Sequence, residues 1–214
     1  MISCRLSQIK RILCFGAHSD DIEIGCGGSI IKLISENPDA EVRWFIFSAD
    51  RNRGREARKS AAEFLDGARV SKVQLFRFHE SYFPGQWTLI KDAVEKIRMQ
   101  YNPDLIFTHF HEDRHQDHRV LSDLAWNAFR DHLILEYEVP KYDGDVGQPN
   151  FYVPLAKRTC ESKIEIILRN FKTQASKNWF SADVFFGMLR IRGIECASRY
   201  AEAFYCRKAI LNGF

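Results

Sequence analysis

Residues 11–28 read RILCFGAHSDDIEIGCGG, and this stretch decides the fold. Its first six residues form a short apolar run that ends in glycine, which is typical of a strand buried on both faces. After a polar turn, residues 27–35 have the apolar spacing of a helix, which Pro38 limits at its C-terminal end. A buried strand followed by a helix predicts the first half of a crossover between parallel strands.

The alternation of strand and helix continues through about the first 135 residues. Apolar runs predict further strands at 41–48, 73–78 and 104–109, and helical spacing predicts helices at 55–65, 87–101 and 120–133. Because parallel strands are joined by such crossovers, the fold class is α/β with a mostly parallel central sheet. Residues 135–154 are less regular, and residues 161–174 and 182–191 again have helical patterns.

The composition indicates one soluble globular domain that covers residues 1–214. Apolar residues make up 45% of the chain and charged residues 28%, which is ordinary for this class. The net charge of +3 is too small to indicate nucleic-acid binding, and no zinc-finger spacing is present. Since the N-terminus lacks the apolar core of a secretory signal and no run could span a membrane, we expect a cytoplasmic protein.

The cysteines agree with this location. None of the six forms a Cys-x-x-Cys pair, and they stand at Cys4, Cys14, Cys26, Cys160, Cys196 and Cys206. This scatter favours reduced, mostly buried thiols over disulfides.

Two segments rich in His and Asp follow predicted strands, at the sheet edge where ligands bind in open parallel sheets. In the first, His18 and Asp21 offer one imidazole and one carboxylate to a divalent cation, and Asp20 is free to lie beside a bound water. A phosphate-binding glycine turn is disfavoured, because the carboxylates would repel phosphate. The alternative is that Ser19 and the two Asp residues only cap the helix.

The second segment, residues 109–118, contains four of the seven histidines of the chain and three carboxylates. A charge run of this kind is usually a solvated face. The density of imidazoles directly after a buried strand instead favours a metal site. Within it, His118 is a candidate ligand, and Asp117 is a candidate partner that orients His115.

Together the two segments supply the three protein ligands of a catalytic metal site, which leaves a fourth position for water. The predicted ligands are His18, Asp21 and His118. Asp20 would accept a proton from the attacking water, and His115 would stabilise the oxyanion or protonate the leaving amine. The pattern therefore predicts hydrolysis of an amide or a related bond. Zn²⁺ is the expected cofactor, although Fe(II), Co(II) or Mn(II) could occupy such a site.

These motifs resemble those of the PIG-L/LmbE-like family of zinc-dependent N-deacetylases. The family's Ala-His-Pro-Asp-Asp stands here as residues 17–21 with Ser19 in place of Pro, and its His-x-Asp-His stands as residues 115–118, preceded by Asp113. Residues 163–174, with Thr173 where Ser is common, are similar to the family's Lys…Gln helix. Residues 192–193 and 200–204 are similar to its closing segment.

The resemblance implies a Rossmann-like three-layer sandwich, with zinc bound by His18, Asp21 and His118. It also implies Asp20 as general base and His115 as acid or oxyanion stabiliser. Family members deacetylate N-acetylglucosamine conjugates, including thiol-precursor, lipid-linked, antibiotic and chitobiose substrates. The expected partner is therefore a small N-acetylated sugar. Ser19 loosens the turn but replaces no ligand.

Substrate recognition is predicted from two further segments. Arg51, Arg53 and Arg55 follow the second strand, and they either clamp a phosphate or carboxylate of the substrate, such as a nucleotide sugar, or form a solvated helix start. His79 and Glu80 follow the third strand, and they either bind substrate hydroxyls or belong to an ordinary loop. Residues 137–147 are either a lid or a contact between copies in a homo-oligomer.

Three other functions fit parts of the pattern. An amidase of a larger acyl conjugate would use the same residues, and would differ in pocket size. A sugar- or nucleotide-binding module would not depend on Asp20, because binding needs no general base. A metal-storage protein would hold several metals per chain. Asp20 beside the proposed ligands favours catalysis over the last two.

Overall fold

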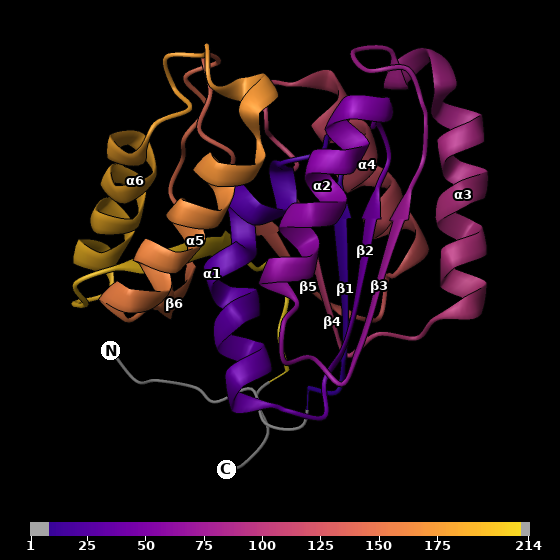
Figure 1. Cartoon of the computed structure of the whole chain (residues 1–214). Helices are drawn as coiled ribbons and strands as arrows, with labels where there is room; N and C mark the ends of the chain where they lie inside the picture. Colours follow the sequence, from indigo (N-terminus) through magenta and orange to yellow (C-terminus); the bar gives the residue numbers. More distant parts are fainter. Residues whose placement is uncertain (1–8, 211–214) are drawn as a thin grey trace.

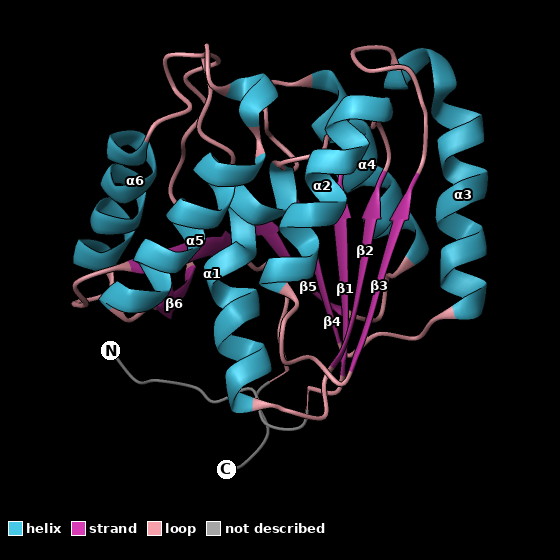
Figure 2. Cartoon of the chain, in the orientation of Figure 1, coloured by secondary structure: helices cyan, strands magenta, loops and turns pink. Residues whose placement is uncertain are grey.

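The computed structural model describes residues 9–210 and has one seven-stranded sheet between two layers of helices (Figures 1 and 2). The strand order is β3-β2-β1-β4-β5-β7-β6. β1 to β5 run parallel, whereas β7 is antiparallel to both β5 and β6. The strands are β1 (Arg11–Gly16), β2 (Glu41–Ile46), β3 (Val70–Leu75), β4 (Leu105–His109), β5 (Leu133–Tyr137), β6 (Phe151–Pro154) and β7 (Ala201–Tyr205).

The helices cover both faces of the sheet, with α1, α2, α5 and α6 on one face and α3 and α4 on the other (Figure 1). They are α1 (Asp21–Glu36), α2 (Arg51–Phe64), α3 (Trp87–Gln100), α4 (Gln116–Ala128), α5 (Lys157–Asn170) and α6 (Ala182–Glu195). Two short 3₁₀ helices, η1 (Phe83–Gln86) and η2 (Lys172–Gln174), lie in connections. This three-layer α/β sandwich confirms the predicted fold class.

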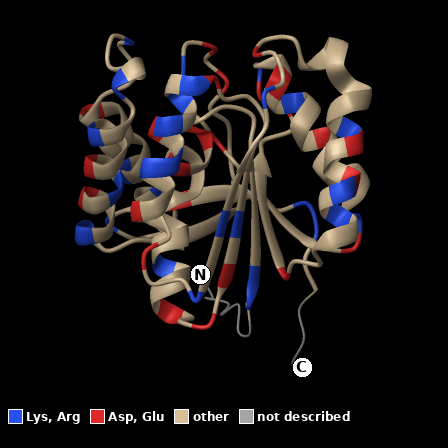
Figure 3. Ribbon diagram, turned by 45° about the vertical axis from the view of Figure 1, so that its right-hand side comes forward, with Lys and Arg blue, Asp and Glu red and all other residues tan. Residues whose placement is uncertain are grey.

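Strand β1 shows why its sequence is apolar without alternation. Ile12 and Cys14 point into the core under α1 and α2, while Leu13 and Phe15 point into the core under α3 and α4. All four side chains are fully buried. A strand in the middle of a sheet covered on both faces has no polar side, so the four residues from Ile12 to Phe15 are all apolar. Charged side chains lie mainly on the helices, with a few on the strands (Figure 3).

Helix α1 begins at Asp21, six residues before the predicted start at Gly27, and it contains several glycines. A Cβ on Gly25 would lie 2.1 Å from Cδ2 of Tyr137, and one on Gly28 would lie 2.9 Å from Oε1 of Glu202. These glycines therefore allow neighbouring side chains to approach the helix closely.

Other boundaries also differ from the predicted ones. Helix α4 ends at Ala128, so Leu133 begins a strand instead of ending a helix. Strand β3 begins at Val70, three residues before the predicted start at Val73, since its exposed residues at the sheet edge carry no apolar signal.

The five cysteines within residues 9–210 are free thiols, and Cys4 lies outside the described residues. Of the helices in this range, none combines the length and the apolar character needed to span a bilayer.

Candidate active site

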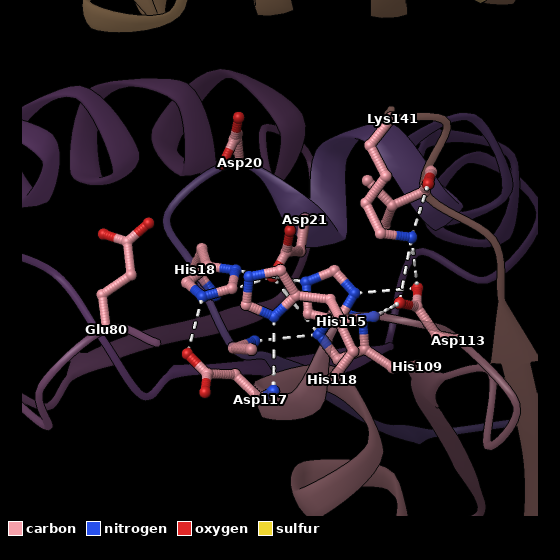
Figure 4. A network of polar contacts seen from close by, with 12 residues as sticks. His18, Asp20, Asp21, Glu80, His109, Asp113, His115, Asp117, His118 and Lys141 are labelled. Atoms are coloured by element: carbon pink, nitrogen blue, oxygen red, sulfur yellow. Dashed lines mark hydrogen bonds and ion pairs between the residues drawn. The ribbon is translucent and has the colours of Figure 1, made fainter. Parts of the chain in front are cut away.

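The His- and Asp-rich segments meet at the carboxyl ends of β1 and β4 (Figure 4). These strands are parallel neighbours in the sheet, with Ile12 beside Leu105 and Cys14 beside Phe107. The chain that leaves β1 therefore emerges next to the chain that leaves β4. Residues about 100 positions apart are brought into contact by this pairing.

The three predicted ligands converge on one point. Nδ1 of His18 lies 3.1 Å from Nε2 of His118 and 3.4 Å from Oδ2 of Asp21, and the last two atoms are 3.5 Å apart. Donors bound tetrahedrally to one ion at about 2.0–2.2 Å are about 3.3–3.6 Å from one another. The side chains are at most 7% exposed. These atoms are thus arranged to hold one divalent cation.

Each ligand imidazole has a carboxylate on its outer nitrogen. Nε2 of His18 lies 3.1 Å from Oδ2 of Asp117, and Nδ1 of His118 lies 2.8 Å from Oδ2 of Asp113. A carboxylate in this position holds the proton on the outer nitrogen, so that the inner nitrogen presents its lone pair to a metal. The arrangement is the one that metal-binding histidines ordinarily have.

The contacts of Asp117 differ from the predicted ones. Its carboxylate also accepts hydrogen bonds from the N–H groups of Ser81 (2.6 Å) and Phe83 (3.1 Å). Asp117 meets His115 only through its own backbone N–H, which donates to Nδ1 of His115 at 3.3 Å. Because His115 caps α4 and Asp117 lies in the first turn, the Asp117 side chain turns toward His18 instead.

His115 lies beside the ligand cluster without being part of its closest triangle. Its ring centroid is 4.8 Å from that of His18 and 4.7 Å from that of His118, and the side chain is half-buried. Burial and the charge of His18 lower the pKa of His115. A neutral imidazole that is still accessible can exchange protons with a bound ligand.

The two ligand imidazoles have pKa values that shift in opposite directions. Burial and the neighbouring His109 lower the pKa of His118 to about 3. Burial acts the same way on His18, but the carboxylates of Asp21 and Asp117 outweigh it and raise the pKa of His18 to about 10. In the metal-free protein the positive charge therefore rests on His18, and a metal ion must displace that proton.

Asp20 is buried and points away from the ligand triangle (Figure 4). Burial and the charge of Asp21 raise the pKa of Asp20, although Arg53 opposes this effect. The guanidinium of Arg53 lies 3.2 Å from Oδ1 of Asp20 and 2.7 Å from Oε2 of Glu80. A carboxylate with a raised pKa beside a metal site is suited to accept and return a proton.

The arginine cluster divides in two. Arg53 reaches the site, where two carboxylates already pair with it, whereas Arg51 and Arg55 are exposed. His79 is exposed as well, and its ring packs on that of Tyr82 at 4.4 Å. Substrate binding by these four residues stays a prediction.

His109 was not among the predicted site residues, yet it is fully buried against the ligands. Its ring stacks on His118 with centroids 3.9 Å apart, and its Nε2 lies 3.3 Å from Oδ2 of Asp21. The same nitrogen accepts a hydrogen bond from the N–H of Ala17 at 2.9 Å. Since an imidazole nitrogen has a single lone pair, this bond leaves none for a metal.

Lys141 and Asp145, from the loop between β5 and β6, were also missed. Nζ of Lys141 lies 2.9 Å from Asp113 and 2.7 Å from Asp145 (Figure 4). Despite burial, the hydrogen bond from His118 and the charge of Lys141 hold the pKa of Asp113 far below its usual range. The only signal in the sequence was one lysine among acidic residues in an irregular segment, which does not specify a contact.

The family comparison matches residues 13–129 to the PIG-L family, described as GlcNAc-PI de-N-acetylase. That span is more than half of the chain and contains both His- and Asp-rich segments.

Solved structures share the whole fold at low sequence identity. N,N'-diacetylchitobiose deacetylase from Pyrococcus horikoshii, complexed with its inhibitor MPG, is 22% identical with a TM-score of 0.71, covering 93% of this chain and 84% of that chain. The zinc-inhibited form of teicoplanin deacetylase Orf2 is 15% identical with a TM-score of 0.71, and the match covers 92% of this chain and 97% of that chain. GalB, the 4-carboxy-2-hydroxymuconate hydratase from Pseudomonas putida, is 14% identical with a TM-score of 0.71, covering 96% and 99%. With its motifs, its site and the family match in agreement, this chain belongs to the PIG-L family.

Proposed function

We propose that this protein is a zinc-dependent hydrolase that removes an N-acetyl group from an amino sugar or a sugar conjugate. The observation that carries the proposal is the triangle of His18, Asp21 and His118 donors, with the buried Asp20 directly before Asp21 in the chain. A binding module would need no such carboxylate. Family membership and the two deacetylases of the same fold support the substrate class.

The donor set fits zinc in its chemistry as well as in its spacing. Two imidazoles and one carboxylate are ordinary zinc ligands, and three protein ligands are typical of catalytic rather than structural sites. Zinc held there would supply the Lewis acidity that makes water a nucleophile near neutral pH. The carboxylates of Asp113 and Asp117 would keep both imidazoles turned toward it.

The protein's own groups then move the protons. Asp20 accepts a proton from the water whose oxygen attacks the amide carbonyl carbon. The C–N bond then breaks, acetate leaves with the new oxygen, and the amine nitrogen takes up a proton from Asp20 or from His115. His115, half-buried beside the ligands, also stabilises the negative charge on the carbonyl oxygen.

Arg53 and Glu80 would contact the sugar. Arg53 holds Asp20 with one nitrogen and the exposed Glu80 with another. An anionic group on the substrate would have to displace Glu80, so Arg53 favours hydroxyls over a phosphate unless Glu80 moves. Arg51, Arg55 and His79 would act only on a substrate that extends beyond the mouth of the site.

The test measures metal content together with amine release from N-acetylated sugars and nucleotide sugars. We expect about one zinc per chain, lost in His118→Ala and kept in Asp20→Asn, which should release no amine. Because a hydratase has the same fold, free amine and acetate are measured rather than substrate loss. Wild-type protein that binds no zinc after reconstitution would refute the mechanism. A zinc-loaded protein that adds water to a double bond but splits no amide would refute the substrate class.

A further inference from the structure

The loop between β5 and β6 approaches the metal ligands through one buried lysine. Lys141 is 10% exposed, and its ammonium contacts both carboxylate oxygens of Asp113 at 2.9 Å (Figure 4). Asp113 in turn accepts from Nδ1 of His118 at 2.8 Å. A continuous chain of polar contacts therefore joins the loop to a metal ligand.

The loop is fixed at its base by separate contacts. Arg192 of α6 binds the Glu138 carboxylate and donates to the carbonyl of Gly147, while the N–H of Gly147 donates to Glu138. These bonds close the two ends of the segment on each other. They do not involve the metal site, so the base can stay closed whatever the ligands do.

The tip between these ends has few ties of its own. Tyr142 is 70% exposed, Val146 is 46% exposed, and Gly144 has a positive φ of 64°. The tip contacts the segment after β4 through Lys141 and through Asp145, which accepts from the N–H of Arg114 at 2.8 Å. Its other tie is at its exposed side, where the Tyr142 hydroxyl accepts from the N–H of Asn178 at 3.2 Å. A segment with exposed side chains and few bonds lies at the low-stability end of a fold.

The electrostatics indicate that Lys141 is the contact that keeps the tip of the loop next to Asp113. Asp113 and Asp145 are 3% and 6% exposed, and both contact the same ammonium. Without that cation two buried carboxylates would face each other, and burying unpaired like charges is unfavourable. Removing the cation should therefore drive the tip, which carries Asp145, away from Asp113.

We propose that Lys141 is a positioning residue that couples the position of the β5–β6 loop to the metal ligand His118 through Asp113. The inference rests on the proposed function only in taking the site to bind a metal. Coupling of this kind is reciprocal. A metal that fixes His118 and Asp113 stabilises the tip of the loop, and a tied loop raises the affinity for metal by the same factor.

The experiment compares full-length wild type, Lys141→Met and Lys141→Arg, each metal-free and saturated with zinc. Hydrogen exchange is followed at the amides of residues 141–147, with α3 as an internal control. Zinc should slow exchange in the wild-type loop about 5-fold or more, which is the lower range of allosteric couplings. Lys141→Met should lose this effect and bind zinc about 10-fold more weakly in chelator competition, whereas Lys141→Arg should retain both.

A purely structural lysine would behave differently. It would lower the melting temperature of Lys141→Met, while zinc would still slow loop exchange by the wild-type factor, and that result would overturn the coupling. An unchanged wild-type loop on adding zinc would also overturn it. Zinc-loaded wild type that releases no amine would refute the proposed substrate and leave this inference intact, whereas wild type without zinc affinity would refute both.

Discussion

Two triads of charged side chains contact the site. In one, Arg53 bridges Asp20 and Glu80, and in the other, Lys141 bridges Asp113 and Asp145. Each has a cation between a carboxylate of the site and a second carboxylate. They differ in solvent contact, because the Glu80 side chain is 47% exposed whereas that of Asp145 is 6% exposed.

This difference in exposure indicates that the two triads have different roles. An exposed ion pair is weak and can exchange partners at little cost, whereas a buried one is held by the penalty of separating its charges. The Arg53 triad contacts Asp20, which in the proposed mechanism must respond to substrate. The Lys141 triad contacts Asp113 behind His118, which in the proposed mechanism must stay in place. The predictions that follow would break or sharpen this contrast, beginning with the largest expected effect.

Asp20→Asn should lower kcat by about 10²–10⁴-fold, the usual contribution of a positioned acid–base group. Zinc content should stay at the wild-type level, because Asp20 lies outside the ligand triangle. The measurements are steady-state amine release and elemental analysis on the same preparation. Loss of zinc in this variant would instead make Asp20 a ligand, and would remove the contrast between the two triads.

Asp113→Asn should weaken zinc binding by about 10–100-fold, as expected for a carboxylate behind a ligand imidazole. Asp117→Asn is the matched variant, because the Asp117 carboxylate contacts the outer nitrogen of His18 as Asp113 contacts that of His118. Competition with a chelator measures both affinities. Arg53→Met, which breaks the triad that contains Glu80, should leave zinc affinity unchanged. Equal loss of zinc in Arg53→Met would show that the two triads are not separate.

Zinc affinity should fall about 10-fold for each unit of pH lowered from 8 to 6, which corresponds to one proton released on binding. The pKa of His18 is raised to about 10, so His18 is protonated throughout this range and must lose its proton to the metal. The pKa of His118 is lowered to about 3 and that of Asp21 lies well below its usual value, so neither contributes. Chelator competition at several pH values gives the slope. A 100-fold change per unit would mean that two protons are released.

The clustering of the proposed metal ligands could be predicted from the sequence because it depends on short-range patterns. His18 and Asp21 lie in the segment that follows β1, and His115 to His118 lie in the segment that follows β4. Because β1 and β4 are parallel neighbours, both segments lie at the same edge of the sheet. The side-chain partner of Asp117 differs from the predicted one. Sequence spacing put Asp117 beside His115, whereas the first turn of α4 directs its side chain to His18.

The supporting cations could not be predicted in the same way. Arg53 lies 33 positions from Asp20, and Lys141 lies 28 positions from Asp113 in a loop without periodicity. Their contacts depend on where loops settle over the sheet, which hydrophobic patterning does not specify. Of the predicted arginine cluster, the helical rotation of α2 brings only Arg53 to Asp20, and Arg51 and Arg55 point to solvent.

Glu80→Gln should have the smallest effect, and it tests whether the exposed triad is as loose as its solvent contact indicates. Removing one partner from an exposed ion pair costs about 0–1 kcal/mol, so the melting temperature should change little. Because Arg53 still pairs with Asp20, kcat should stay within about 3-fold of the wild-type value. The free energy of a 3-fold change is smaller than that of a shift of one pKa unit. Asp145→Asn is the matched change in the buried triad, and it should weaken zinc binding because the loop loses part of its tie to Asp113. If Glu80→Gln lowered zinc affinity while Asp145→Asn did not, the assignment of substrate response to one triad and metal retention to the other would have to be reversed.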